Sequence, residues 1–346
     1  MQCSKTDPST CAPAVAVVGA GAVGLWLADA LDCAGWRVSI VARGPTLAAL
    51  EADGARVERA GTVRVSRLAA GPPSVLGAQD YVLISVKAQQ MPAVAPLLTP
   101  LLASGTVVVS AMNGIPWWFF QDFKGPLKDR QIESVDPSGS QARLLPRTGT
   151  LGAVVHASIR TTAPGRAHVL ATDRLLVGEP SGQITARVMT LVRALSAGGI
   201  NAEASADIRR DIWSKLWGNM NMNPISALTR SGTGEILADA EVRALCARMM
   251  EEMAACGQRI DLPISMTVQE RMDVTARLGN FQTSMLSDVE SGRPLEIGPQ
   301  LGAIVEIAQQ LGVAAPFCRA VLGLTGLLSA RLAAASTGAP SDYRLS

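Results

Sequence analysis

A glycine-rich turn near the N-terminus constrains the fold more than any other feature of the chain. Gly19-Ala20-Gly21-Ala22-Val23-Gly24 matches the pattern G-x-G-x-x-G, with an apolar run at residues 14–19 before it and a helical period at about 22–34 after it. In this context the first glycine permits the tight turn, the second lets a pyrophosphate approach, and the third lets the helix pack on the strand. Because free N–H groups at the helix start hold phosphates, the turn predicts a dinucleotide-binding βαβ unit.

Short apolar runs predict the rest of the sheet. Runs at residues 37–42, 81–86 and 106–111 are typical of buried parallel strands, with a helix-like stretch at 91–102 between the last two. Residues 55–68 alternate charged and apolar side chains around Gly61, which predicts a hairpin. Strands that alternate with helices indicate a doubly wound α/β sheet. Residues 149–157 and 174–178 are candidates for further strands.

The strand signals stop at about residue 206, and the length of 346 residues favours two domains. We expect an N-terminal Rossmann-type domain over residues 14–205 and an all-α domain over 206–335, with the boundary after the Gly198-Gly199 turn. Residues 1–13 are expected to form a flexible arm and residues 336–346 a tail. Helical periods in the second domain cover residues 207–228, 235–260, 266–290, 296–311 and 317–335.

Residues 121–147 interrupt this pattern, because they are polar, contain three prolines and show no steady period. A loop of this length is usually functional or disordered. Long loops cost little in closure entropy, so deletion of about residues 124–143 is expected to leave the fold intact. The four aromatic residues just before it, at 117–120, either line a pocket or pack the insertion against the protein, and the second interpretation is favoured.

Polar residues at the ends of three predicted strands indicate where ligands bind. NAD-specific folds carry an acidic residue after the second strand, whereas Arg43 stands there and favours a 2′-phosphate, so NADP(H) is predicted. Lys87 and Asn113-Gly114 follow two further strands, at the edge where open α/β sheets bind ligands. The alternatives are a solvated Arg43, an ordinary charge at a helix start for Lys87, and a plain turn for Asn113-Gly114.

The helical half carries its strongest signal at Lys215, Asn219 and Asn223, which recur every four residues and share one stripe of a helix. No other charged residue occurs between Lys215 and residue 228, so this helix is expected to be buried. Burial disfavours a charged lysine, which suits a proton donor that works near neutral pH. The alternative is a lysine whose charge reaches the surface beside two asparagines.

Two further candidates lie later in the chain. Ser284 falls within a helical period, and Glu296 opens the next helix, where the helix dipole stabilises a carboxylate by about 0.3–1 kcal/mol. A structural role for Glu296 is as well supported by the sequence as a catalytic one. His156 and His168 stand in no metal or Ser-His-Asp arrangement, so both are expected to be structural and no metal site is expected.

The composition excludes several classes of protein. Lys+Arg 31 against Asp+Glu 29 gives a net charge of +2, which argues against a nucleic-acid surface. Six scattered cysteines without a C-x-x-C pair favour reduced thiols in the cytoplasm over zinc or disulfides. No signal peptide is expected. The apolar run at residues 317–336 contains Arg319 and Arg331, so we expect no membrane span there.

Together, the following segments resemble the ketopantoate reductase (2-dehydropantoate 2-reductase) family: GAGAVG at 19–24, Arg43, VKA at 86–88, NG at 113–114, KLWGNMNMNPISAL at 215–228 and TSMLSDVESGRPLEI at 283–297. The resemblance runs from residue 15 to about 312, apart from the insertion at 121–147. The last two motifs are far more specific than the glycine motif. The resemblance implies a Rossmann domain joined to a helical domain, with the site in the cleft.

The resemblance also implies a role for each candidate. Lys215 matches the general acid that protonates the ketone oxygen as NADPH delivers hydride, and Glu296 matches the acidic residue that engages the substrate hydroxyl and the lysine. Substrate hydrogen bonds are implied for Asn113, Asn219, Asn223 and Ser284. Cofactor contacts are implied for Arg43, Lys87 and, at the strand-end mouth, Asn113, besides the glycine turn Gly19, Ala20, Gly21, Ala22, Val23 and Gly24.

The chain departs from the family just after Asn113, where aromatic residues replace a shorter glycine-rich stretch. The reaction class therefore carries over, whereas ketopantoate itself does not. We expect NADPH-dependent reduction of a small 2-keto acid, 2-dehydropantoate or a relative, within or near pantothenate biosynthesis. The alternatives are another hydroxyacid or imine dehydrogenase of the 6-phosphogluconate dehydrogenase-like group, and a non-catalytic NADP(H)-binding sensor. A homodimer is left open.

Overall fold

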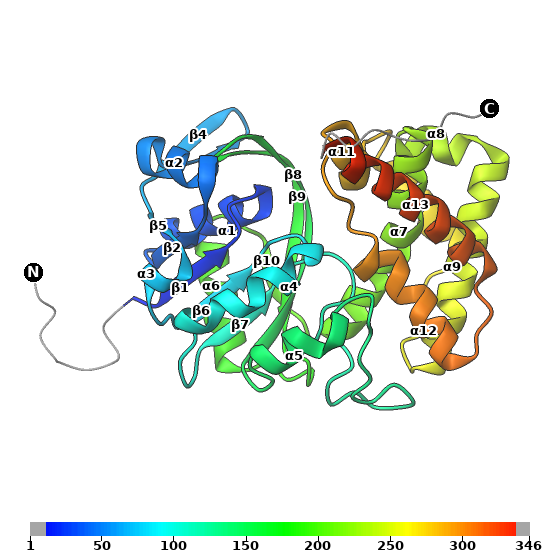
Figure 1. Ribbon diagram of the computed structural model, residues 1–346, viewed down its shortest axis with the longest axis horizontal. Helices are drawn as coiled ribbons and strands as arrows, with labels where there is room; N and C mark the ends of the chain where they lie inside the picture. The colour runs from blue at the N-terminus through cyan, green and yellow to red at the C-terminus, as the bar shows by residue number, and fades with distance from the viewer. Residues whose placement is uncertain (1–11, 337–346) are drawn as a thin grey trace, which may run out of the picture. The chain divides into compact units, whose positions relative to one another are not determined.

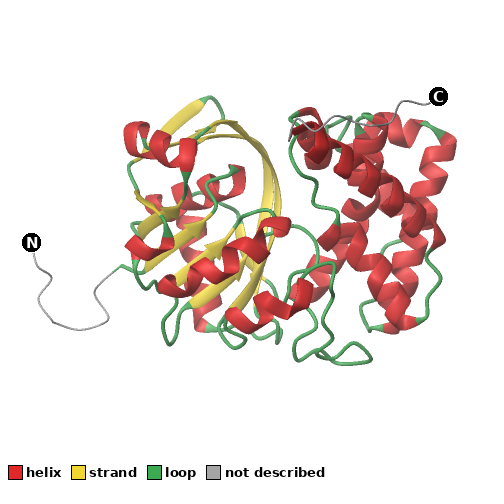
Figure 2. Ribbon diagram, in the orientation of Figure 1, coloured by secondary structure: helices red, strands yellow, loops and turns green. Residues whose placement is uncertain are grey.

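The computed structural model describes residues 12–336, so most of the expected arm and tail lie outside the described residues. The chain divides into two compact units, one formed by residues up to Met112 with Ser140–Asp211, the other by Asn113–Gly139 with Ile212 onward. The first unit is a sheet with helices and the second is built of helices and loops (Figures 1 and 2). The expected fold class, a Rossmann-type sheet followed by a helical domain, is confirmed.

The first unit is formed in chain order by the following elements: β1 (Ala14–Val18), α1 (Ala22–Cys33), β2 (Arg37–Val41), α2 (Gly44–Asp53), β3 (Ala55–Arg59), β4 (Thr62–Ser66), β5 (Ala69–Gly71), α3 (Pro73–Leu76), β6 (Tyr81–Ile84), η1 (Ala88–Gln90), α4 (Met91–Val94), η2 (Ala95–Leu101), β7 (Val107–Ser110), α5 (Ser140–Leu144), β8 (Thr150–Ala163), β9 (Arg166–Gly178), α6 (Ala186–Ala197) and β10 (Ala202–Ala204).

The strands of the first unit form one sheet in the order β4-β3-β9-β8-β7-β6-β1-β2-β5, with β10 beside β9. The chain leaves β1 toward β2 and β5 on one side and later continues from β6 toward β7 on the other, so the strand order reverses beside β1. Val18 is in register with Val41 and with Ile84, and all these strands are parallel. The glycine turn, Arg43 and Lys87 therefore leave the sheet at one edge, where such folds bind ligands.

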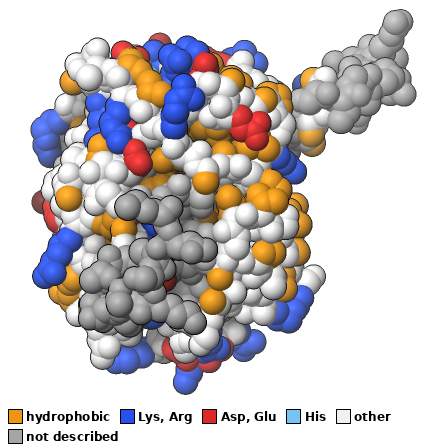
Figure 3. Space-filling model, turned by 90° about the vertical axis from the view of Figure 1, so that its left-hand side faces the viewer, with side chains coloured by type: hydrophobic (Ala, Val, Ile, Leu, Met, Phe, Trp, Pro, Cys, Tyr) orange, Lys and Arg blue, Asp and Glu red, His pale blue; other side chains and the backbone are white. Residues whose placement is uncertain are grey.

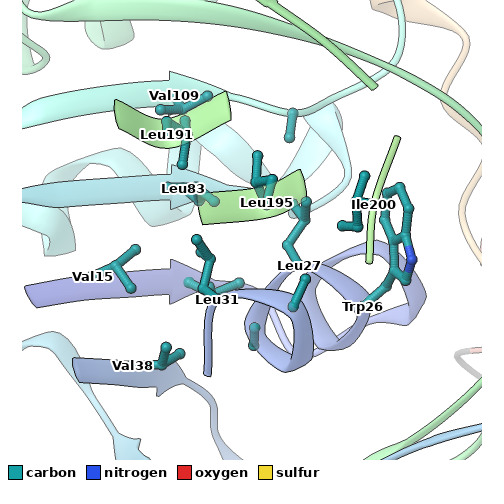
Figure 4. Packing of buried hydrophobic residues seen from close by; sticks show 14 of the residues in the cluster. Val15, Trp26, Leu27, Leu31, Val38, Leu83, Val109, Leu191, Leu195 and Ile200 are labelled. Carbon is teal, nitrogen blue, oxygen red and sulfur yellow. The ribbon is translucent and has the colours of Figure 1, made fainter. Parts of the chain in front are cut away.

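The core of this unit lies between the sheet and two helices. Figure 4 shows side chains of β1, β2, β6 and β7 pointing toward α1 and α6. Each of these large apolar side chains is at most 7% exposed, and burial of each contributes roughly 1.5–3 kcal/mol. The packed residues include Val15, Val38, Leu83 and Val109 from the strands and Leu27, Leu31, Leu191 and Leu195 from the helices.

Several predicted elements differ from those observed. The hairpin at residues 55–68 is confirmed, with Ala60 and Gly61 at φ 47° and 77° in its turn. The stretch at 91–102 is only a short helix followed by 3-10 turns, because prolines recur along it. The candidate strands at 149–157 and 174–178 are parts of one long antiparallel hairpin, β8–β9. Its outer half is largely exposed, so it lacks the apolar period that would have predicted it.

The second unit contains η3 (Pro137–Gly139), α7 (Ile208–Thr229), α8 (Thr233–Ala238), α9 (Ala240–Arg259), α10 (Val268–Arg277), α11 (Ser284–Glu290), η4 (Gly298–Gly302), α12 (Ala303–Leu311) and α13 (Pro316–Ser336). The boundary between the units lies in the first turn of α7, after Asp211, rather than near residue 205. Two expected helices are each broken in two. Asp239 caps α9 through its carboxylate, and Gly279, at φ 79°, follows α10.

The segment expected to be a removable insertion is part of a core. Phe123, Leu127, Ile132 and Val135 are between 2% and 8% exposed. Residues up to Gly139 belong to the helical unit, and only the remainder belongs to the sheet unit. Deletion of residues 124–143 would remove several of these buried side chains, at roughly 1.5–3 kcal/mol each, so we now expect the deletion to destabilise the fold. Single buried residues at irregular spacing leave no period in a sequence.

The surface and the last helix bear on the expected partners. Figure 3 shows basic and acidic side chains interspersed over the face of the molecule that it presents. By length and composition alone, α13 is long and apolar enough to cross a membrane over Pro316–Ala335, with 17% of that stretch buried. By length and composition, Arg319 and Arg331 therefore do not exclude a membrane span in this helix, contrary to the expectation from the sequence. One such helix is weak evidence for a membrane segment.

Candidate active site

The glycine turn after β1 has the geometry that its motif predicts. Gly19 has φ 105°, a conformation that side chains disfavour. A Cβ on Gly24 would lie 1.9 Å from the Gly19 carbonyl oxygen, so α1 can pack this closely only on a glycine. A Cβ on Gly21 would meet nothing within 4 Å, which leaves open space at the helix N-terminus. The hydroxyl of Ser85 donates to the Val18 and Gly19 carbonyls at 3.1 Å and fixes the turn.

This turn fits a dinucleotide pyrophosphate. Gly21 occupies the N-cap of α1 and no side chain caps the helix, so the N–H groups of Ala22 and Val23 face the open space. Arg43 is exposed at the N-cap of α2, directly after β2. Lys87 is half-buried after β6, and its backbone N–H donates to the Gln90 side chain at 3.2 Å. The expected cofactor residues other than Asn113 thus share one edge of the sheet, whereas Asn113 belongs to the helical unit.

Lys215 is held by the packing of α7. The other faces of this helix carry Trp213, Leu216, Trp217 and Met220, all at most 2% exposed, so the helix cannot rotate without losing core contacts. Lys215 remains on the half-buried face, and its ammonium Nζ donates to the Asn113 side-chain oxygen Oδ1 at 2.9 Å. Two predicted site residues that are 102 positions apart are thereby brought into direct contact within one unit.

The electrostatics of Lys215 suit proton transfer. Burial lowers the pKa of its ammonium from 10.5 to about 8, while the negative charge of Glu296 acts in the opposite direction. Glu296 is itself buried, with 7% of its surface exposed. It lies two residues before the short π-helix η4, rather than at the first residue of a helix as expected. A lysine with this pKa exchanges protons readily near neutral pH.

Asn219 and Ser284 leave polar groups available to a ligand. Asn219 lies one turn after Lys215 on α7 and is half-buried. Ser284 is exposed at the first residue of α11, where the preceding Thr283 caps the helix by accepting from the Leu286 N–H at 3.1 Å. Among the described residues, neither the Asn219 amide nor the Ser284 hydroxyl has a hydrogen-bond partner. Both therefore retain their hydrogen-bonding capacity.

Asn223, the third residue of the predicted stripe, has a different environment. It is 6% exposed, and its amide Nδ2 donates to Oε1 of Gln300 at 2.8 Å. Gln300 lies within the short π-helix η4, close behind Glu296 in the chain. Asn223 thus ties the Lys215 helix to the segment that carries Glu296. The spacing of residues along the sequence does not indicate this contact, because Asn223 and Gln300 are 77 residues apart.

The segment after Asn113 is fixed to the same π-helix. The Ile115 N–H donates to the Pro299 carbonyl at 2.7 Å. A Cβ on Gly114 (φ 87°) would lie 2.4 Å from that carbonyl oxygen, so this close approach requires glycine. Farther along, the Glu306 carboxylate accepts from the Glu133 and Ser134 N–H groups at 2.7 and 2.9 Å, and from the Ser134 hydroxyl at 2.7 Å. We call residues 113–139 the brace.

The aromatic residues of the brace pack rather than line a pocket. Trp118, Phe119 and Phe120 are at most 2% exposed. Phe119 stacks on Trp213 of α7, with ring centroids 6.3 Å apart and planes 28° apart. The favoured interpretation of these residues therefore agrees with the structure. Their packing anchors the brace on the helix that carries Lys215.

The remaining reactive side chains lie elsewhere. His156 and His168 are on β8 and β9, and His168 approaches Glu58 at 3.9 Å. Within residues 12–336, no group of three or more His, Cys, Asp or Glu residues could hold a metal ion. Burial raises the pKa of the Cys246 and Cys256 thiols to about 12, which makes them poor nucleophiles.

Comparisons with known proteins agree with this geometry. Residues 15–182 match the family profile "Ketopantoate reductase PanE/ApbA", and residues 207–329 match its C-terminal counterpart. The chain is 38% identical to a 2-dehydropantoate 2-reductase of Mesorhizobium japonicum over 91% of its own length and 97% of the relative's.

Solved structures give the same picture. A Ralstonia solanacearum protein assigned to ketopantoate reductase superposes with a TM-score of 0.89 at 40% identity, covering 93% of this chain and 99% of that one. A D-mandelate dehydrogenase with bound NADH and anilino(oxo)acetate shares the fold alone, at TM-score 0.80 and 19% identity, covering 92% of this chain and 99% of that one. The chain belongs to the ketopantoate reductase family of oxidoreductases.

Proposed function

We propose that this protein reduces 2-dehydropantoate, or a closely related small 2-keto acid, to the 2-hydroxy acid with NADPH, and that Lys215 is the proton donor. The observation that carries the proposal is the Lys215 ammonium, which donates to Asn113 at 2.9 Å and has its pKa lowered to about 8 by burial. The names of the relatives support the substrate class. The proposed cofactor is NADP(H), because Arg43 stands where an acidic residue would favour NAD.

The residues of this site and the bound cofactor together account for each requirement of ketone reduction. When bound, the reduced nicotinamide supplies the hydride that adds to the carbonyl carbon. Negative charge then develops on the carbonyl oxygen, and Lys215 donates a proton to it. The product is a secondary alcohol, and the neutral amine that remains takes a proton from solvent before the next turnover.

Neighbouring side chains prepare Lys215 for this step. The Asn113 oxygen accepts one N–H of the ammonium and so holds the proton donor in place. The charge of Glu296 raises the lysine pKa against the effect of burial and so keeps the donor protonated near pH 7. Asn219 and Ser284 are proposed to hydrogen-bond the substrate. For Asn223 we propose an indirect role, since its amide is bonded to Gln300.

The test combines a substrate panel with two variants. Small 2-keto acids are offered to the wild type with NADPH, and oxidation is followed by absorbance. On the best substrate, Lys215→Ala should lower kcat by at least the roughly 10²–10⁴-fold typical of losing a general acid. Binding of NADPH should hardly change, because the glycine turn, Arg43 and Lys87 belong to the sheet unit.

The matched control is Lys124→Ala, which removes an exposed lysine of the same unit and should leave kcat unchanged. A Lys215→Ala variant that keeps near-wild-type kcat would show that another group donates the proton. Failure of the wild type to reduce any 2-keto acid with NADPH would refute the proposed function as a whole.

A further inference from the structure

Arg271 is a half-buried cation that has no role in the proposed proton transfer. The guanidinium of Arg271, on α10, lies flat against Gly218 of α7. A Cβ on Gly218 would come within 2.2 Å of its Nη2, 2.8 Å of its Cζ and 2.9 Å of its Nε. The arginine can take this position only because residue 218 is a glycine. Glycine weakens a helix relative to alanine, so its presence inside a 22-residue helix calls for a packing or functional reason.

The charge of Arg271 is not neutralised by the described part of the chain. Its side chain makes one hydrogen bond there, from Nη1 to the Thr275 hydroxyl at 3.4 Å, and no carboxylate among residues 12–336 pairs with it. Burial lowers the pKa of the guanidinium. A guanidinium offers five N–H donors, and burying a charge without a partner is costly. These donors therefore suit an anionic group that the protein itself does not supply.

The position of Arg271 relates it to Lys215. Residues three and four apart on a helix share a face, so Gly218 and Asn219 both lie on the face of α7 that carries Lys215. Gly218 is about 4.5 Å farther along the helix axis than Lys215, at 1.5 Å per residue. The guanidinium thus covers the same face about one turn beyond the proton donor, with the available amide of Asn219 beside it.

We propose that Arg271 binds a carboxylate of the keto-acid substrate, and that Gly218 is required to admit its guanidinium. The inference rests on the proposed function, since it names the group that anchors the substrate beside Lys215. An arginine guanidinium and a carboxylate form two parallel N–H···O bonds. These bonds fix the orientation of the carboxylate in addition to pairing its charge. The carboxylate is either the one next to the reacting carbonyl or a second one at the far end of the substrate, and the test separates these two.

The test uses variants that remove or displace the guanidinium. Arg271→Met keeps the length of the side chain and removes its charge, and Arg271→Lys keeps a charge without the two-pronged geometry. Gly218→Ala leaves Arg271 in place but pushes the guanidinium away from its position. This last substitution should leave the melting temperature unchanged or raise it, because alanine favours the helix. Gly323→Ala in α13 is the matched control, since a Cβ there meets nothing within 4 Å.

The expected result is a change in KM. Arg271→Met should raise KM for the keto acid by about 10- to 100-fold, as expected for loss of a hydrogen bond to a charged group. Its kcat and its affinity for NADPH should change far less. Gly218→Ala should shift KM in the same direction, Arg271→Lys should recover part of the loss, and Gly323→Ala should match the wild type.

Two substrate pairs locate the carboxylate. If Arg271 holds the carboxylate next to the carbonyl, every 2-keto acid should lose affinity in Arg271→Met, and the wild-type preference for an acid over its amide should disappear. If it holds a distal carboxylate, only substrates with a second acid group should be affected. Unchanged KM for both classes in a folded Arg271→Met variant would overturn the proposal.

A binding measurement separates this proposal from the proposed function. Oxamate and N-oxalylglycine, non-reducible analogues of 2-keto acids with one and two carboxylates respectively, are titrated into the NADPH-loaded wild type and the loaded Arg271→Met variant by calorimetry. Weaker binding to the variant supports Arg271 even if no turnover is found, in which case only the proposed function fails. Equal binding of both analogues to both proteins, or no binding of either analogue to the wild type, would overturn the role of Arg271.

Discussion

The glycine turn and the Lys215 site are built in opposite ways. The turn is made by six consecutive residues, and its geometry follows from where side chains are missing: a Cβ on Gly24 would lie 1.9 Å from the Gly19 carbonyl, whereas one on Gly21 would meet nothing. The Lys215 site draws on separate stretches of the chain. Lys215 contacts Asn113, and Asn223 contacts Gln300, at separations of 102 and 77 residues.

This difference determines how each region should respond to substitution. The turn is built from neighbouring residues, so a substitution there alters either the packing of the helix on the strand or the binding of the cofactor. The effect differs from one glycine to the next. The Lys215 site depends on ties between distant segments, so a change far from Lys215 should still affect the reaction. Substitutions in the two regions should therefore separate these two behaviours.

Two glycines of the turn should respond differently to the same change. Gly24→Ala forces a Cβ into the Gly19 carbonyl, and overpacking of this kind costs about 1–3 kcal/mol of stability. Gly21→Ala fills only open space, so the melting temperature should stay the same while NADPH binding weakens. Thermal unfolding and NADPH titration of both variants check this. A Gly21→Ala variant with wild-type affinity would show that the space at the helix start is not where the pyrophosphate lies.

Cofactor choice tests a single contact at the same edge of the sheet. Arg43→Ala should weaken NADPH binding by about 10- to 100-fold, the loss expected for a hydrogen bond to a charged group, and leave NADH binding unchanged. Arg160→Ala, at an exposed arginine of the same unit, is the control. Titration of each protein with both cofactors provides the measurement. Equal affinity of the wild type for NADPH and NADH would contradict the proposed preference.

The brace offers the opposite test, in which a remote change affects catalysis. Glu306→Ala removes the acceptor of two brace N–H groups, so stability should fall by about 1.5–3 kcal/mol. We expect kcat to fall several-fold as Asn113 loses its fixed position, with NADPH affinity unchanged. Glu251→Ala, an exposed carboxylate on α9, is the control. If Glu306→Ala is destabilised but keeps full kcat, the brace supports the fold without positioning the site.

The same contrast explains what the sequence could predict. The glycine turn, the strands that flank it and the helical second half follow from local patterns, because each needs only neighbouring residues. Helical spacing predicts the stripe of Lys215, Asn219 and Asn223. It does not predict that Asn223 is buried and that its amide donates to Gln300, a residue of a distant segment. A role for Arg271 could not be predicted, because the only sign of it in the sequence is Gly218, a glycine inside a helix of a different segment.

The burial of the brace could not be predicted from the sequence, for a related physical reason. Its buried residues, such as Phe123 and Ile132, are separated by polar residues at irregular intervals, so no period indicates burial. The carboxylate that holds it, Glu306, is 172 residues from Ser134. A segment that lacks secondary structure can still be a fixed part of a core when another segment satisfies its backbone N–H groups.

The dependence of kcat/KM on pH tests the central claim most directly, because it reports the protonation of Lys215 in the free enzyme. Burial lowers the pKa of this group to about 8. Reduction needs the protonated form, so kcat/KM should be flat below that pH and fall about tenfold per unit above it. Lys215→Arg, whose guanidinium stays charged, should be much slower and show no such fall. A variant that retains the fall near pH 8, or a wild type whose rate is flat to pH 10, would contradict the account.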